Sequence, residues 1–371
     1  MVVARQLQVQ EAEAMAKSFG SPQNPELEVA PGVGFTNSNF VLGQTFDFSG
    51  TRAARAQRAR AEIQVARANL RKAQLSVGSE FLSAYANYLT ARRNQANAQY
   101  GVTVAKATVD GIKKRVEIGE APAVQLTRAE VEMNRSEQAM TLAKSEVAIR
   151  RAEVNSLLAR PSQAELPLAV WVPVADSASL SQGALTRRPE AIEALAQIEI
   201  AKAFELEARR AGLPSLFAGV ATDTWSFDRR PFHKDNVGLQ LRLTMPLFDL
   251  GENRFAVRSA EAGRKAREAM LKDTARRINL EIETETTNLN AARDVANSYE
   301  TGIVPKAEQM VKAMQAGLEA GLTSFLEVLE AQKTLFQLRR EASDATRNLH
   351  LAEVRMLTAT AQLPGLETNR P

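Results

Sequence analysis

The sequence predicts a mainly α-helical fold with a small β part. Three observations support this prediction: a helix-forming composition, a duplicated order of elements, and short segments in which apolar residues alternate with polar ones. Ala, Leu, Glu, Gln, Arg and Lys dominate the chain of 371 residues, and aromatic residues make up only 5%. Such a composition favours long helices that pack along seams over a single central core.

An internal duplication organises the chain. Residues 46–50, Phe-Asp-Phe-Ser-Gly, match residues 248–252, Phe-Asp-Leu-Gly-Glu, and residues 116–119 match residues 318–321 at the same spacing. Each copy reads as a helix, two short strands, a very long helix, a glycine break and another long helix. We therefore predict a first repeat at residues 1–159, truncated at its N-terminus, a linker at 160–187, a second repeat at 188–363 and a tail at 364–371.

The strand signal is clearest in the second copy, where apolar side chains take every other position of residues 237–247. The alternating residues are Val237, Leu239, Leu241, Leu243, Met245 and Leu247. A weaker signal covers residues 27–35 and 40–48, so each repeat is predicted to contribute one β-hairpin. Strands of about ten residues with one apolar face fit a transmembrane barrel, and they also fit a soluble sheet packed on helices.

A very long helix is predicted at residues 50–118, which contain no Pro and repeat apolar or small residues at a spacing of three and four. About 70 residues at ~1.5 Å per residue extend roughly 100 Å, more than a globular domain requires. Gly119 and Gly321 suit helix C-caps, Pro122 suits the first turn of a helix, and Thr323 is a candidate N-cap. The two long helices of each copy should therefore form an antiparallel hairpin.

Composition argues against most catalytic and nucleic-acid-binding classes. The net charge is +4, but Lys and Arg alternate with Asp and Glu, as on solvated helix faces. There is no Cys, and the two histidines, His233 and His350, are far apart in sequence. The sequence has no Walker A, GxSxG or HExxH motif. We therefore expect no enzyme, no cofactor, no metal site and no nucleic-acid partner.

The N-terminus and the hydropathy pattern bear on membrane insertion. No window of 18 residues is wholly apolar, so no transmembrane helix is expected. Met1 leads into Val-Val-Ala-Arg-Gln without a basic and then apolar block, so a signal peptide is expected to be absent from this chain. If the protein is exported, the chain is expected to be mature or truncated.

Four stretches of the sequence together resemble the TolC-type family of outer-membrane efflux proteins. They are Asn-Pro-Glu-Leu at 24–27, the strand-to-helix corner at 46–52 with its copy at 246–251, Arg-Pro-Glu at 188–190, and Gly-Leu-Thr-Ser-Phe-Leu-Glu-Val-Leu-Glu-Ala-Gln at 321–332. The resemblance covers nearly the whole chain. The first and third stretches look most like the CzcC-like branch, which serves heavy-metal efflux pumps.

The resemblance implies a mainly α fold with membrane β. Long coiled-coil hairpins would form an α-helical barrel in the periplasm, and two β-hairpins per chain would contribute to a trimeric 12-strand outer-membrane β-barrel. The implied function is the outer-membrane channel of a tripartite efflux system, a passive exit duct for small molecules or metal ions in a Gram-negative bacterium. The implied partners are a homotrimer, a periplasmic adaptor (membrane fusion) protein, an inner-membrane pump of the type I secretion or RND class, and outer-membrane lipid.

The resemblance also implies roles for residues beside the two glycine breaks. Glu327 and Glu330 would form an acidic ring at the periplasmic entrance, although acids at this end of a helix also complement its dipole. The two helix tips would dock the adaptor, although each also reads as an ordinary capped turn. The tip residues are Val116, Ile118, Gly119, Glu120, Gly321, Leu322 and Thr323.

Four strands per chain leave two open edges, which lipid does not tolerate. If the strands span a membrane, several chains must close the barrel. Four strands per chain allow a barrel of 8, 12 or 16 strands, and twelve follows only from the resemblance. The alternative class is a periplasmic adaptor or a soluble coiled-coil scaffold. An adaptor usually has one helical hairpin, whereas this sequence repeats strand, strand, helix, helix twice.

Overall fold

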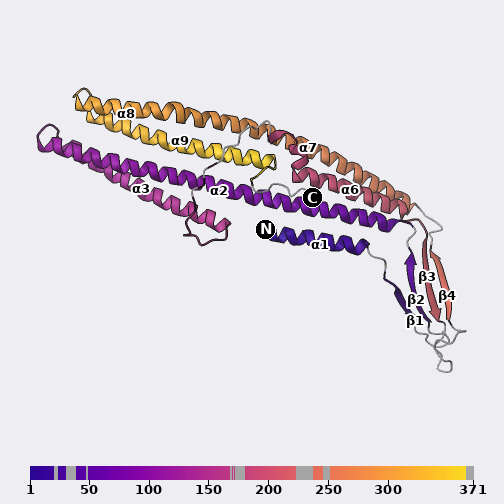
Figure 1. The fold of residues 1–371 in the computed structure, drawn as a ribbon. Helices are drawn as coiled ribbons and strands as arrows, with labels where there is room; N and C mark the ends of the chain where they lie inside the picture. The colour runs from indigo at the N-terminus through magenta and orange to yellow at the C-terminus, as the bar shows by residue number, and fades with distance from the viewer. Residues whose placement is uncertain are drawn as a thin grey trace. The chain divides into compact units, whose positions relative to one another are not determined.

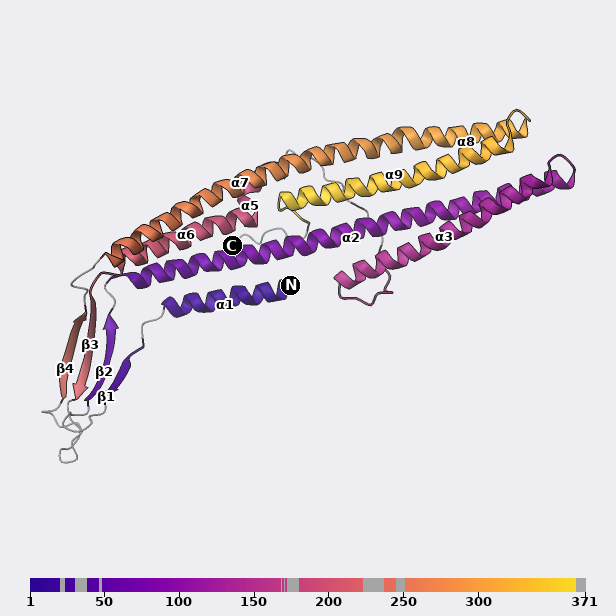
Figure 2. The same ribbon diagram turned by 180° about the vertical axis from the view of Figure 1, so that it is seen from behind.

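The computed structural model describes residues 1–20, 24–30, 39–46, 49–167, 169, 171, 180–222, 237–244 and 251–364. In these ranges the chain is mainly helical and carries four strands, so the predicted fold class is confirmed at this level (Figures 1 and 2). The chain divides into two compact units, Met1–Ala73 with Leu185–Arg277 and Gln74–Ala184 with Ile278–Pro371. Each unit combines segments from both halves of the sequence.

The first unit contains one antiparallel sheet in the order β1-β2-β3-β4 (Figure 1). Its strands are β1 Glu26–Ala30, β2 Asn39–Phe46, β3 Ser215–Thr222 and β4 Val237–Thr244. Leu27 lies opposite Leu42, Leu42 opposite Val220, and Val220 opposite Leu239. One face of the sheet is therefore a continuous apolar surface, on which Leu239 is 89% exposed.

Both predicted hairpins are present as the pairs β1–β2 and β3–β4. Residues 31–38, 47–48, 223–236 and 245–250 lie outside the described residues. These segments include His233, most of the duplicated Phe-Asp landmark and the last residues of the predicted strands.

The helices of the first unit pack through alanines and ion pairs. They are α1 (Val2–Gly20), α5 (Ala184–Arg187, from its second residue), α6 (Pro189–Arg210) and the first parts of α2 (Thr51–Glu117) and α7 (Glu252–Ser298). Ala54 on α2 and Ala203 on α6 are fully buried, and such small side chains allow close approach of helices. Glu205 on α6 accepts hydrogen bonds from Arg209 and Arg264 at 2.8 Å each. These bonds lower the pKa of Glu205 and link α6 to α7.

The second unit is built from two antiparallel helix pairs (Figures 1 and 2). The first pair is α2 with α3 (Ala123–Leu157), and the second is α8 (Val304–Glu319) with α9 (Phe325–Ala359). Burial is divided among small clusters, such as Tyr88 with Val154 and Leu289 with Met356. Of the helices that the structure describes, none is both long and apolar enough to cross a membrane.

The very long helix predicted in the first copy is confirmed as Thr51–Glu117, but its counterpart in the second copy is not continuous. A π-helical turn, η2 (Tyr299–Ile303), separates α7 from α8. Pro305 follows this turn, and a proline lacks the N–H for the helical bond and clashes with the carbonyl four residues earlier. The helix therefore widens at this point. The hydroxyl of Tyr299 donates to Glu341 on α9 at 3.1 Å, which holds the turn in place.

Trp171, in the segment between α3 and α5, packs against α9. Its ring stacks on His350 with centroids 4.3 Å apart, and its Nε1 donates to Glu353 at 2.6 Å. Glu353 is 2% exposed. Burial, and then the charge of Arg93, lower the pKa of His350 from its ordinary 6.5 to about 4. The imidazole is therefore neutral at pH 7 in its stacked position.

We expect this stack to make stability depend on pH. Between pH 6.5 and about 4 the unfolded chain binds a proton at His350 that the folded chain does not. The free energy of unfolding should therefore fall as the pH is lowered through this window and level off below it. The variant His350→Phe keeps an aromatic ring beside Trp171 but cannot titrate. Thermal unfolding followed by circular dichroism should show a smaller fall in the free energy of unfolding for this variant than for the wild type. An equal fall in both proteins would contradict the assignment.

Candidate functional site

The first helix tip joins α2 to α3 through a left-handed glycine. Gly119 has a φ of +81°, and its N–H donates to the carbonyl of Val116 at 3.1 Å. The N–H groups of Glu120 and Ala121 both donate to the carbonyl of Arg115, at 2.8 and 3.2 Å. These bonds satisfy the carbonyls that the end of a helix leaves free. A residue with a side chain would pay about 1–2 kcal/mol for this backbone conformation.

The second tip, between α8 and α9, repeats this geometry. Gly321 has a φ of +73° and donates to the carbonyl of Leu318 at 3.2 Å. Leu322 and Thr323 donate to the carbonyl of Gly317 at 2.8 and 3.2 Å. Each of these bonds joins the residues that match those of the first tip. The duplication seen in the sequence therefore extends to the hydrogen bonds of the two turns.

The predicted docking residues divide into two groups by exposure. Ile118 is 68% exposed and Leu322 is 83% exposed, and Glu120 is also on the surface. Val116 is half-buried and packs into an apolar cluster, and the hydroxyl of Thr323 donates to a carbonyl of α8 at 2.9 Å. Among the predicted docking residues, the exposed side chains are thus two apolar groups and one carboxylate, whereas Val116 and Thr323 support the turns.

The N-cap of α9 is Ser324, and the prediction of Thr323 in this role is wrong. Ser324 Oγ accepts from the N–H of Glu327 at 3.3 Å, and the carboxylate of Glu327 accepts from the N–H of Ser324 at 2.7 Å. This reciprocal pair is a capping box. The backbone N–H and then the side chain of Ser324 lower the pKa of Glu327 below its ordinary 4.5. The carboxylate of Glu327 is therefore ionised at pH 7 and engaged with its own helix end.

Glu330 lies one helical turn beyond Glu327 and differs from it. Its side chain is exposed and, within the described part of the chain, forms no hydrogen bond or ion pair. The helix that carries both acids is anchored at its start, because Phe325 is buried beside Ala129 of α3. Glu330 thus presents a carboxylate to solvent from a fixed helix end. Across the described ranges, no three His, Asp or Glu side chains are grouped to hold a metal ion.

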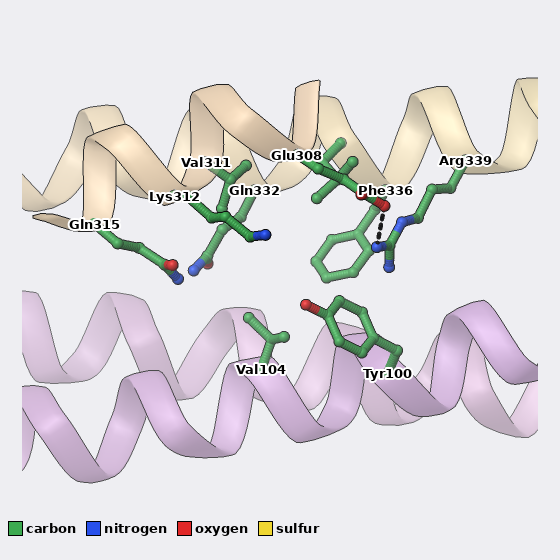
Figure 3. Close-up of a pocket in the computed structure, with 10 residues that line it drawn as sticks. Tyr100, Val104, Glu308, Val311, Lys312, Gln315, Gln332, Phe336 and Arg339 are labelled. Carbon is green, nitrogen blue, oxygen red and sulfur yellow. Dashed lines mark hydrogen bonds and ion pairs between the residues drawn. The ribbon is translucent and has the colours of Figure 1, made fainter. Parts of the chain in front are cut away.

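A cleft between α2 and the α8–α9 pair was not predicted from the sequence (Figure 3). It has a volume of about 270 Å³. The guanidinium of Arg339 lies 4.5 Å from the centroid of the Tyr100 ring and pairs with Glu308 at 2.6 Å. Tyr100 also meets the ring of Phe336 edge to face, with centroids 6.2 Å apart. These contacts hold α2 against the second helix pair. No local motif signals them, because the partners lie in three different helices.

Comparison with known proteins gives one family match and several relatives. The sequence model of the family described as "Outer membrane efflux protein" matches residues 2–160 and 180–362. The chain is 26% identical to the cobalt-zinc-cadmium resistance protein CzcC of Cupriavidus metallidurans over 245 residues, or 64% of this chain and 56% of CzcC. It is 24% identical to the outer membrane protein TolC of Escherichia coli over 137 residues, or 37% of this chain and 27% of TolC. The chain thus spans about half of CzcC and about a quarter of TolC.

Solved structures share the fold over nearly the whole chain. CusC superposes with a TM-score of 0.79 at 20% identity, covering 97% of this chain and 88% of CusC. The outer membrane protein VceC of Vibrio cholerae gives a TM-score of 0.77 at 19% identity, covering 97% of this chain and 92% of VceC. The open state of the MtrE outer membrane channel of Neisseria gonorrhoeae gives a TM-score of 0.77 at 16% identity, covering 98% of this chain and 86% of MtrE.

The tip geometry predicts opposite effects for two glycines near the end of α2. Gly119→Ala forces a side chain into the left-handed region and should destabilise the tip by about 1–2 kcal/mol. Gly111→Ala is the matched control, because Gly111 lies inside the helix and an added Cβ meets no atom within 4 Å. This control should stabilise the helix by about 0.5–1 kcal/mol. Amide hydrogen exchange around the tip measures both effects, and effects of the same sign would contradict the assignment.

Proposed function

The chain belongs to the family of outer membrane efflux proteins, and we propose that it is the outer-membrane channel of a tripartite efflux system. The observation that carries the proposal is the family match, which covers both halves of the chain. The match does not favour the alternative of a periplasmic adaptor or a coiled-coil scaffold. The channel would be a passive duct across the outer membrane of a Gram-negative bacterium and into its periplasm.

The two unlike faces of the sheet support membrane insertion. Apolar side chains of all four strands line one face, and Leu239, Leu241 and Leu243 are exposed on it. In water, exposing such a surface is costly, whereas lipid covers it. We propose that three copies join edge to edge, so that their strands close a 12-strand barrel with this face toward lipid. We also propose that the chain consists of a first repeat at residues 1–159, a linker at 160–187, a second repeat at 188–363 and a tail at 364–371.

The helix tips are the proposed docking surface for a periplasmic adaptor, which would connect the duct to an inner-membrane pump. Ile118 and Leu322 supply exposed apolar contacts at corresponding positions of the two tips. Glu120 adds a carboxylate, whose nearest cation is Arg115 at 3.8 Å. A partner that covers two equivalent apolar tips should itself carry short apolar turns. Gly119, Gly321, Val116 and Thr323 would shape this surface rather than bind the adaptor.

We propose that Glu327 and Glu330 line the periplasmic entrance, where a threefold axis would gather acids from three chains. Glu330 carries most of this role, because its carboxylate is free for ions while that of Glu327 caps α9. A ring of carboxylates favours cations over anions. The similarity to a cobalt-zinc-cadmium resistance protein favours divalent metal cations as the exported solutes.

The barrel proposal predicts alternating accessibility along β4. Spin labels at Leu239 and Leu241 should be reached by oxygen dissolved in lipid, because these side chains lie on the apolar face. Labels at Gly238 and Gln240 should be reached instead by a water-soluble nickel chelate. Gly238 is a clean site for a label, since an added Cβ meets nothing within 4 Å. Equal accessibility at the two pairs of positions in reconstituted vesicles would refute insertion of this sheet.

The entrance proposal predicts a cation-selective conductance in planar bilayers that trivalent cations block from the periplasmic side. Glu330→Gln should weaken this block by about tenfold or more, because three carboxylates near a trivalent ion are lost. Glu327→Gln should weaken it less, since that carboxylate is held by Ser324. Glu137→Gln removes an exposed acid elsewhere on the helices and serves as the control. A block unchanged in the double variant would place the gate elsewhere.

A further inference from the structure

The polar face of the sheet carries a cluster that reaches from its first strand to its last. The members, here called the sheet-face cluster, are Glu28 on β1, Gly43 on β2, Phe217 and Gly219 on β3, and Gln240 and Arg242 on β4. The register places Gly43 opposite Gly219 and Gly219 opposite Gln240, while Phe217 lies opposite Arg242. Because side chains alternate along a strand, the four side chains of the cluster project from the face opposite Leu239, and the two glycines leave bare backbone on that face.

Two glycines form the floor of the cluster. A Cβ added at Gly43 would lie 2.8 Å from the Cα of Gly219, and one added at Gly219 would lie 2.9 Å from the Cα of Gly43. The ring of Phe217 lies over the same space, 3.0 Å from the position of a Cβ on Gly219. Any larger residue would collide with the opposite backbone or with this ring. Glycines at the centre of a sheet also permit strong bending.

Arg242 crosses the sheet over this floor. Its guanidinium lies 5.2 Å from the centroid of the Phe217 ring and 3.4 Å from the carboxylate of Glu28. The two residues stand on β4 and β1, which are three strand spacings apart, or about 14 Å at ~4.8 Å each. The register places Glu28 level with Gly238, four residues along β4 from Arg242, which adds about 13 Å along the strand at ~3.3 Å per residue. Two side chains span this diagonal only if the sheet twists and curves toward them. The polar face is therefore concave, and both charged groups remain about half exposed on it.

Gln240 adds an unsatisfied acceptor to the same face. Its Oε1 is buried and has no hydrogen-bond partner within the part of the chain that the structure describes. A buried carbonyl oxygen without a donor is costly, and it attracts donors or cations. The polar groups on this face beside Arg242 thus include the carboxylate of Glu28 and the free acceptor of Gln240.

We propose that Arg242 and Glu28 set the charge selectivity of the strand-built segment of the channel, which favours small cations over anions. This inference rests on the proposed function, because only closure by several copies makes the concave face the wall of a lumen. The filter is separate from the acids of α9, since its residues lie on the strands of the first unit.

The preference follows from the charges on the concave face. Among the described strand residues of that face, each chain carries two carboxylates, Glu26 and Glu28, and one guanidinium, Arg242. Symmetric copies repeat these groups at one level of the lumen. Arg242 offsets one carboxylate, so the described strands of every copy leave one negative charge facing the permeating ions. Rings of charged side chains at close range select between ions of opposite sign.

The test is the ratio of potassium to chloride permeability, obtained from reversal potentials across a salt gradient in planar bilayers. Arg242→Gln should raise the ratio by about threefold and Glu28→Gln should lower it by about threefold, because each removes one charge per chain near the ion path. The effect should grow at about 0.01 M salt, where the Debye length is roughly 30 Å. The exchange Glu28→Arg with Arg242→Glu preserves the pair and the net charge, so it should keep the wild-type ratio.

The outcomes separate this inference from the proposed function. If the wild-type protein conducts and neither single variant changes the ratio of potassium to chloride permeability, the filter is overturned and the channel function stands. A wild-type protein that forms no closed oligomer and no conductance would overturn both. If Arg242→Gln fails to assemble, Glu28→Gln decides alone, because its predicted shift has the opposite sign. An effect of either variant on the trivalent block at the entrance, without a shift in the ratio, would also overturn the filter.

Discussion

In the sheet as described, β1 and β4 pair on one side only, so their outer edges carry backbone N–H and C=O groups without a strand partner. Such edges invite pairing in water and are too costly to leave open in lipid. The same sheet exposes apolar side chains around Leu239 on one face and curves toward Arg242 on the other. Joining β4 of one copy to β1 of the next relieves both edges and covers neither face. A lipid outside and a water-filled lumen inside would then satisfy both faces.

The helices are limited by burial, because long helix pairs bury little apolar surface per residue. Fully buried positions are often alanine, as at Ala54, Ala203 and Ala352, and larger apolar residues gather in small separate clusters. Charged networks such as that around Glu205 supply specific contacts between helices, here α6 and α7. An ion pair that is partly exposed to solvent stabilises little, so these networks act mainly in fixing register. Removing one cluster should therefore loosen a segment without unfolding the chain.

The acids at the start of α9 show how local and global roles compete at one site. A capping box needs an acid at the third position of the helix, and Glu327 fills it. An acidic ring needs carboxylates that point into solvent, and Glu330 meets that condition. The motif that resembles other family members therefore combines a residue that builds the helix end with one that is free to meet ions. Both lie beside a turn that Gly321 makes possible.

The sequence by itself determined the helix-rich fold, the duplicated hairpins, the long helix at Thr51–Glu117 and the glycine turns, because each rests on periodicity or on a local conformational preference. It did not reveal the π-helical turn beside Pro305 or the N-cap at Ser324. At each place the local sequence fits more than one backbone arrangement, and packing in the folded chain decides between them. Only the tertiary structure brought Arg242 to Glu28, Tyr100 to Arg339 and Trp171 to His350. These partners are distant in sequence, and a contact of that kind depends on strand register, sheet curvature and helix packing that no local pattern encodes.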